Sequence, residues 1–331
     1  MSSIKMRTTP AGTRDLLFEE CAAANTVERA VTGVFEKNGY QQVMTPGIEY
    51  YDVFERRLSG IPCEQLYKLV DREGEILVLR PDSTLPIARM VGSRLKENDG
   101  VLRLYYNQSV FRVSPAMSGR LNEVRQAGIE LIGSAGIEAD IEVITTAVKA
   151  LRKLGLEGFR IELGHAGFFK ALVAGVTDDP DLRENIRLCV EAKNYSLLSD
   201  LIDNLPGEEQ AALRALPRLF GGEEVFKKAK ALIKGNAEAN EALAYLKEVY
   251  DILSGRDAAG FLSIDLGLVQ RNDYYTGLVF GGYIEGSGLR ILSGGRYDGL
   301  LGHFGESRPA TGFAIETSAL IPVILSEEKK K

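Results

Sequence analysis

The most informative segment of the chain covers nine positions, which read Val124-Arg125-Gln126-Ala127-Gly128-Ile129-Glu130-Leu131-Ile132. We predict that this segment is a strand, so that Gln126 and Glu130 share one face with Gly128 between them. An amide that donates and accepts, an acceptor carboxylate and a glycine that leaves space above the sheet suit a small molecule with an ammonium group. The alternative is a strand face that only meets solvent, and spacing alone leaves both open.

The flanking segments predict a mixture of strands and helices. Apolar runs predict further strands at residues 41–45, 76–79, 102–106, 110–113 and 159–163. Apolar residues at three- and four-residue steps predict helices at residues 16–38, 84–95 and 141–154. Asn38-Gly39 supplies a stop for the first helix, and Asp82 or Ser83 a cap for the second.

The composition changes over residues 167–255, which are rich in Ala, Leu, Glu and Lys and predict helices. Strand signals return over residues 261–291, and a final apolar helix is predicted at residues 316–324. This order predicts an α+β fold, in which a helical segment is inserted into a mostly antiparallel domain. The predicted parts are a discontinuous domain, a helical insertion and a C-terminal tail, at residues 1–166 with 256–325, 167–255 and 326–331.

The charge and the cysteines exclude several classes of function. The chain has 331 residues, enough for one large or two modest domains, and a net charge of −6. Proteins that bind nucleic acid usually carry a basic face, so nucleic acid is not the expected partner. The three cysteines are far apart and the histidines number only two, which predicts neither a disulfide framework nor a metal site.

No apolar run approaches the roughly 20 residues that span a bilayer, and the N-terminus lacks the apolar core of a signal peptide. We therefore expect a cytoplasmic protein with no membrane partner.

Two further clusters have open interpretations. The glycine-rich stretch at residues 286–299 lacks the spacing of known phosphate-binding loops, so its glycines serve either tight hairpins or a close approach to a ligand. Tyr274 and Tyr275 are adjacent, and in a strand they point to opposite faces, so that at most one lines a given pocket. The alternative is that both are core tyrosines with satisfied hydroxyls.

Taken in order, several motifs resemble the catalytic domain of histidyl-tRNA synthetases, a class II aminoacyl-tRNA synthetase family. The matching segments run through the chain in the family's order, at residues 10–15, 39–49, 79–84, 111–126, 268–277, 293–298 and 312–314. The resemblance implies a class II antiparallel sheet flanked by helices, and it identifies residues 39–49 with the family's dimer-forming first motif.

The departures from this family concern its nucleotide site. Ala319 stands where the third motif has an arginine that grips ATP phosphate, and Ser114 stands where the second motif has a glutamate associated with adenine. Gln270 replaces the catalytic arginine before the tyrosine pair, with Arg271 one position late. Removing positioned cations from a developing phosphate charge costs several kcal/mol of transition-state stabilisation. We therefore expect no amino-acid activation, and we also expect no C-terminal anticodon-binding domain.

The positions that match the family's amino-acid pocket are largely retained. By resemblance, the histidine-binding residues are Asp82, Thr84, Arg112, Gln126, Glu130, Tyr274 and Tyr275. A retained amino-acid pocket beside a lost ATP site is similar to the regulatory subunits of ATP phosphoribosyltransferase. That resemblance implies a non-catalytic chain without a cofactor, which joins a short catalytic subunit in the first step of histidine biosynthesis.

The same resemblance implies a homodimer within a hetero-octamer, and feedback inhibition with histidine as the effector. Two alternatives remain at this point. One is a divergent ligase that still forms an aminoacyl-adenylate, and the other is a tRNA-binding paralogue without catalysis.

Overall fold

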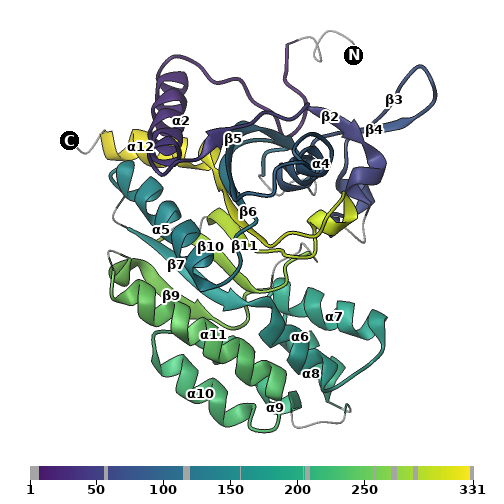
Figure 1. Cartoon of the computed structure of the whole chain (residues 1–331), viewed down its shortest axis with the longest axis vertical. Coiled ribbons are helices and arrows are strands. Elements are labelled where there is room, and N and C mark those ends of the chain that lie inside the picture. Colours follow the sequence, from purple (N-terminus) through teal and green to yellow (C-terminus); the bar gives the residue numbers. More distant parts are fainter. Residues whose placement is uncertain are drawn as a thin grey trace.

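A large mixed sheet runs through the molecule, and helices cover it (Figure 1). The computed structural model describes most of the chain, at residues 7–55, 59–114, 120–156, 158–203, 205, 209–256, 258–269, 274–285 and 290–328. The sheet has nine strands in the order β1-β5-β6-β12-β11-β10-β7-β9-β8, and a separate sheet of three strands has the order β2-β4-β3. Among the described strands, only β1 with β5 and β7 with β9 pair in parallel, so the predicted α+β class with a mostly antiparallel sheet is confirmed.

The strands of the first half are β1 (Gln41–Gln42), β2 (Ile48–Tyr50), β3 (Lys68–Val70), β4 (Ile76–Leu79), β5 (Leu102–Phe111) and β6 (Glu123–Ile132). Those of the second half are β7 (Phe159–His165), β8 (Phe220–Gly221), β9 (Leu262–Asp265), β10 (Leu278–Ile284), β11 (Arg290–Arg296) and β12 (Ala310–Glu316).

The helices that flank the sheet are α2 (Glu19–Lys37), α4 (Thr84–Arg94), α5 (Ile137–Lys153) and α12 (Thr317–Glu328). The central segment holds α6 (Ala166–Ala174), α7 (Pro180–Glu191), α8 (Tyr195–Ile202), α9 (Glu209–Ala215), α10 (Glu224–Leu232) and α11 (Ala237–Ser254). Short 3-10 helices lie at Tyr51–Phe54, Cys63–Gln65, Leu216–Arg218, Ala259–Phe261 and Leu301–His303. No helix in the described ranges is long and apolar enough to cross a membrane.

Two apolar cores occupy the two faces of the large sheet. On one face Ile129 and its neighbours pack beneath α2 and α5, and this core continues into the central helices. On the other face Tyr106 of β5 joins Leu85 of α4 and the tyrosines that precede β10. Alternation along the strands places these residues on opposite faces, so the predicted site on β6 faces the second core.

The first predicted helix ends as its sequence indicates. Gly39 has a φ of +85°, a conformation that glycine adopts without strain. The Tyr40 amide donates to the Phe35 carbonyl and the Gly39 amide donates to the Glu36 carbonyl, the pair of bonds that defines a Schellman cap. The helix begins later than expected, at Glu19.

The strands predicted at residues 102–106 and 110–113 are instead one continuous strand, β5. The polar residues between them resemble a turn, but each finds a partner across the layers. The Asn107 amide donates to Glu28 of α2 at 2.8 Å, and the Gln108 amide donates to the Ser83 hydroxyl at 3.0 Å. Buried polar groups with partners are tolerated in a strand, which the sequence pattern cannot reveal.

The central helices lie together beside one end of the sheet, in the lower half of Figure 1. Helix α11 packs on α5, α6 and β7, and the short strand β8 extends the large sheet by pairing with β9. The helices at residues 166–254 therefore share their core with the sheet. Their separation as a distinct domain stays a prediction.

Candidate functional site

The turn between β4 and α4 is fixed by Arg80, which is buried at 5% exposure. Its guanidinium donates to the carbonyl oxygens of Thr45 and Pro46, each at 2.7 Å, and to that of Ser109 at 2.7 Å. These bonds join three separate backbone segments. Arg80 thereby holds the start of α4 against β5, which sets the position of the residues that follow it.

Asp82 caps α4, as one of the two predicted alternatives. Its Oδ1 accepts from the backbone amides of Thr84 at 2.8 Å and Leu85 at 3.2 Å, whereas Ser83 makes no capping bond. Its Oδ2 lies 3.6 Å from Nη2 of Arg112. Burial raises the pKa of the Asp82 carboxyl, and Arg112 and the two amides oppose that shift.

Glu130 lies at the centre of the predicted site and is 1% exposed. The Thr84 hydroxyl donates to its Oε1 at 2.8 Å, and the Tyr297 hydroxyl donates to its Oε2. Burial raises the pKa of Glu130 to about 8, although both hydroxyls favour the ionised form. The carboxyl can therefore gain or lose a proton near neutral pH.

The two adjacent tyrosines do not point to opposite faces. Both precede β10, so the alternation of a strand does not apply to them, and how many of the two line a pocket stays a prediction. The ring centroids of Tyr274 and Tyr275 lie 4.8 Å apart, and both rings meet Tyr297, at 5.6 and 6.5 Å. The three rings form one cluster beside Glu130, which we call the tyrosine cluster.

Gln126 lies on the same face of β6 as Glu130, as predicted. It pairs in register with Gln108 of β5 and with Glu316 of β12. Its side chain is 6% exposed and makes no hydrogen bond within the part of the chain that the structure describes. A buried amide without partners costs free energy unless a ligand or water completes its bonds.

The expected gap above Gly128 is filled. A Cβ atom at this position would collide with the hydroxyl end of Tyr106 and with the Phe313 carbonyl. Gly128 therefore makes room for the Tyr106 hydroxyl rather than for a ligand. Gly312 makes room for the Glu130 side chain in the same way, because a Cβ atom there would collide with the Glu130 carboxylate.

The structure thus brings together Asp82, Thr84, Arg112 and Glu130, with the tyrosine cluster beside them. Sequence reasoning missed Tyr297 and Tyr106. Tyr297 falls in the glycine-rich stretch, whose pattern points to its glycines, and Tyr106 falls in an ordinary apolar strand. Their hydroxyls are buried beside a carboxyl, which no local pattern indicates.

Two positions that differ from the synthetase family are described, and neither carries a cation. Ser114 is held by Asn122, whose side-chain oxygen accepts from its backbone amide at 2.8 Å. Ala319 of α12 packs against the core beneath the sheet. Gln270 and Arg271 lie outside the described residues, as does Asp273.

Comparisons with known proteins agree on the fold and on the family. The family model described as Histidyl-tRNA synthetase matches residues 12–320. A protein of Clostridium kluyveri named ATP phosphoribosyltransferase regulatory subunit is 43% identical over 316 residues, which cover 94% of this chain and 81% of that relative.

Solved structures give the same result. A crystal structure described as an ATP phosphoribosyltransferase regulatory subunit/histidyl-tRNA synthetase from Bacillus halodurans matches with a TM-score of 0.89 and 36% identity, covering 98% of this chain and 84% of that one. A histidine–tRNA ligase subunit from Alicyclobacillus acidocaldarius matches with a TM-score of 0.84 and 27% identity, covering 97% and 98%.

Proposed function

The chain belongs to the histidyl-tRNA synthetase-like family and, within it, to the regulatory subunits of ATP phosphoribosyltransferase, and from that premise we propose that it senses histidine without catalysing a reaction. It joins a short catalytic subunit in the cytoplasm and carries feedback inhibition by histidine. The observation that carries this proposal is the buried site around Glu130, in which Gln126 has an unused amide.

The two ends of this site suit the two ends of histidine. Around Glu130, the buried carboxyl offers an acceptor for the N–H of an imidazole, and the tyrosine cluster offers ring faces against it. Towards Arg112, a carboxylate, a guanidinium and the amide of Gln126 suit an α-ammonium and an α-carboxylate. We therefore propose that Asp82, Thr84, Arg112, Gln126, Glu130, Tyr274 and Tyr275 bind histidine.

Calorimetry tests this site with a matched pair of variants. Gln126→Ala removes an amide in the buried site, so histidine affinity should fall by about tenfold, which is the loss of one or two hydrogen bonds. Gln42→Ala removes an exposed amide on β1 and should bind histidine like the wild type. If both variants bind histidine equally well, alone and with the catalytic subunit, histidine does not use this site.

The replaced nucleotide residues support a non-catalytic role. Ala319 packs as an apolar side chain, and Ser114 is engaged with its own loop, so neither offers charge to a triphosphate. We expect no histidine-dependent exchange between ATP and pyrophosphate above the rate without protein. Measurable exchange would favour a divergent ligase instead.

An uncovered apolar surface supports a homodimer. The three-stranded sheet places apolar side chains in register on one face, at Ile48, Tyr50, Leu69, Leu77 and Leu79. Ile48, Tyr50 and Leu69 are exposed, although apolar faces of sheets are normally covered. We call this surface the apolar sheet face. A second copy of the chain covers it in the proposed homodimer, and the homodimers combine with catalytic subunits in a hetero-octamer.

A further inference from the structure

Strand β12 ends in a carboxylate on the face of the sheet that holds the proposed histidine site. A Cβ atom on Gly312 would collide with the Glu130 carboxylate, and Glu316 lies four residues further along the same strand. Side chains alternate along a strand, so Glu316 points to the face of Glu130. The intervening Phe313 and Ile315 confirm this alternation, because they pack into the core on the opposite face.

The register of the sheet places Glu316 beside Gln126. The two residues are partners across β12 and β6, and Gln126 is in turn the partner of Gln108 on β5. Directly opposed residues have Cβ atoms about 4.5–5.5 Å apart, so the side chains of Glu316 and Gln126 are neighbours. Within the described ranges neither side chain makes a hydrogen bond. An amide and a carboxylate in one row therefore have bonding capacity left for a ligand.

The charges around Glu316 suit a zwitterion. Burial raises the pKa of its carboxyl, and the positive charges of Arg112, Arg290 and Arg120 oppose that shift. None of these arginines forms a salt bridge with Glu316 in the part of the chain that the structure describes. The carboxylate is partly buried, so an ammonium at hydrogen-bond distance would stabilise it more than it would in open water.

The other two carboxylates of the site already accept hydrogen bonds. Asp82 caps α4 through one oxygen and faces Arg112 with the other. Glu130 accepts from two hydroxyls, one on each oxygen. An ammonium group has three donors, which need acceptors. Glu316 offers two oxygens that accept no hydrogen bond from the described residues, and Gln126 offers its amide oxygen beside them.

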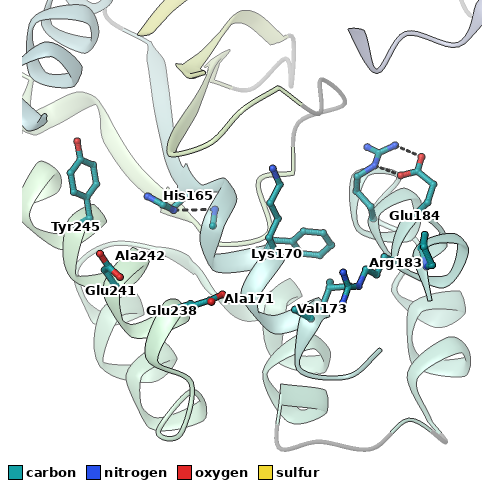
Figure 2. Close-up of a pocket in the computed structure, with 15 residues that line it drawn as sticks. His165, Lys170, Ala171, Val173, Arg183, Glu184, Glu238, Glu241, Ala242 and Tyr245 are labelled. Carbon is teal, nitrogen blue, oxygen red and sulfur yellow. Dashed lines mark hydrogen bonds and ion pairs between the residues drawn. The ribbon is translucent and has the colours of Figure 1, made fainter. Parts of the chain in front are cut away.

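The cavity between α6, α7 and α11 differs from this site in its charges (Figure 2). It has a volume of about 720 Å³, and its Arg187 forms an ion pair with Glu184 at 2.7 Å on the same helix. Glu238 and Glu241 also line it, but both are exposed and are solvated by water. A ligand ammonium therefore gains less from a carboxylate there than from the partly buried Glu316.

We propose that Glu316 makes the site selective for a ligand that carries an α-ammonium. Its carboxylate accepts from the ammonium of histidine, the oxygen of Gln126 accepts beside it, and the α-carboxylate of the ligand faces Arg112. This role rests on the proposed histidine site, and it distinguishes histidine from imidazole acids that have no amino group.

Calorimetry with three related probes tests the role of Glu316 on the full chain. L-histidine carries both charges, imidazolepropionate lacks the ammonium, and histamine lacks the carboxylate. The wild type should bind L-histidine about tenfold or more tightly than imidazolepropionate, because the latter loses a charge-assisted hydrogen bond.

The variant Glu316→Gln keeps the shape of the side chain and removes its charge. Its affinities for L-histidine and histamine should fall about tenfold, whereas imidazolepropionate, which has no ammonium, is not weakened. A purely structural role would weaken all three probes alike. Glu248→Gln is the matched control, because Glu248 is exposed on α11, and it should bind all three like the wild type.

Three results would overturn this role. They are equal wild-type affinities for L-histidine and imidazolepropionate, a Glu316→Gln variant that binds L-histidine as tightly as the wild type, and equal weakening of all three probes. If Gln126→Ala weakens L-histidine and Glu316→Gln does not, the histidine site stands and Glu316 has no part in it. If L-histidine does not bind the wild type, alone or with the catalytic subunit, both the site and the role of Glu316 fail.

Discussion

At the scale of single residues, the buried carboxyl of Glu130 is the centre of the proposed site. A carboxyl with no access to water is costly to ionise, and here the two hydroxyls of Thr84 and Tyr297 favour the charge while the nearby Asp82 opposes it. Burial therefore raises the pKa of the Glu130 carboxyl to about 8, close to physiological pH. An imidazole N–H that donates to this carboxyl would favour its ionised form, so histidine affinity should rise with pH until Glu130 is ionised in the free protein.

The raised pKa of Glu130 makes stability depend on pH. Its stabilising contribution is complete below its ordinary pKa of 4.5 and is lost as pH rises through about 8, because the folded state holds the proton more tightly. The loss is roughly 4 kcal/mol for a shift of this size. Urea unfolding from about pH 5 to about pH 8.5 measures it.

The comparison with Glu130→Gln isolates this group, since a neutral amide does not titrate. Other buried carboxyls also have raised pKa values, at Asp82, Glu162, Asp265 and Glu316. The wild type should therefore lose more stability with pH than the variant does. An identical pH slope in both proteins would mean that Glu130 does not carry the proton.

Close packing at Gly312 gives a second prediction at this scale. Gly312→Ala forces a Cβ into the Glu130 carboxylate and the Ile129 carbonyl, and overpacking of this kind costs about 1–3 kcal/mol. Gly33→Ala is the control, because it meets open space within α2 and should stabilise the protein by up to about 1 kcal/mol. Thermal unfolding measures both, and equal melting temperatures would contradict the packing of Glu130.

At the scale of elements, the sequence predicts most of the fold but only part of the site. Helix α2 with its glycine cap, strand β6 and helix α5 follow from apolar periodicity, which is strong where an element has one buried face. The sequence predicts two strands where β5 is one, because the polar residues in its middle bond to Glu28 and Ser83, which lie far away in the chain. Local sequence does not indicate Tyr297 or Tyr106 for the same reason, since Tyr297 donates to Glu130 on another strand and Tyr106 is buried close enough to interact with that carboxyl.

The apolar sheet face gives a prediction at this scale. Leu69→Lys places a charge in the proposed contact between two copies and should convert a dimer to a monomer, because burying an unpaired charge is costly. Val70→Lys is the matched control, on the same strand but on the opposite face, where it is exposed. Light scattering coupled to size exclusion measures the mass. Dimers of equal stability in both variants would place the interface elsewhere.

At the scale of the whole molecule, the proposed roles separate along the sheet. The apolar sheet face lies near β2 and β4, the buried site lies around β6, and the central helices lie beyond β7 (Figure 1). Histidine can regulate a complex only if it binds one quaternary state more tightly than another. Glu130 accepts hydrogen bonds from Thr84 of α4 and from Tyr297 of the tyrosine cluster. A ligand that binds at Glu130 would therefore act on both α4 and the tyrosine cluster.

The central claim is tested by reconstitution of this chain with a short ATP phosphoribosyltransferase catalytic subunit, measuring phosphoribosyl transfer against histidine concentration. We expect that transfer requires this chain, that histidine inhibits it, and that Gln126→Ala shifts the inhibition to about tenfold higher histidine while Gln42→Ala does not. Transfer that is the same with and without this chain, or that histidine leaves unchanged, would contradict it.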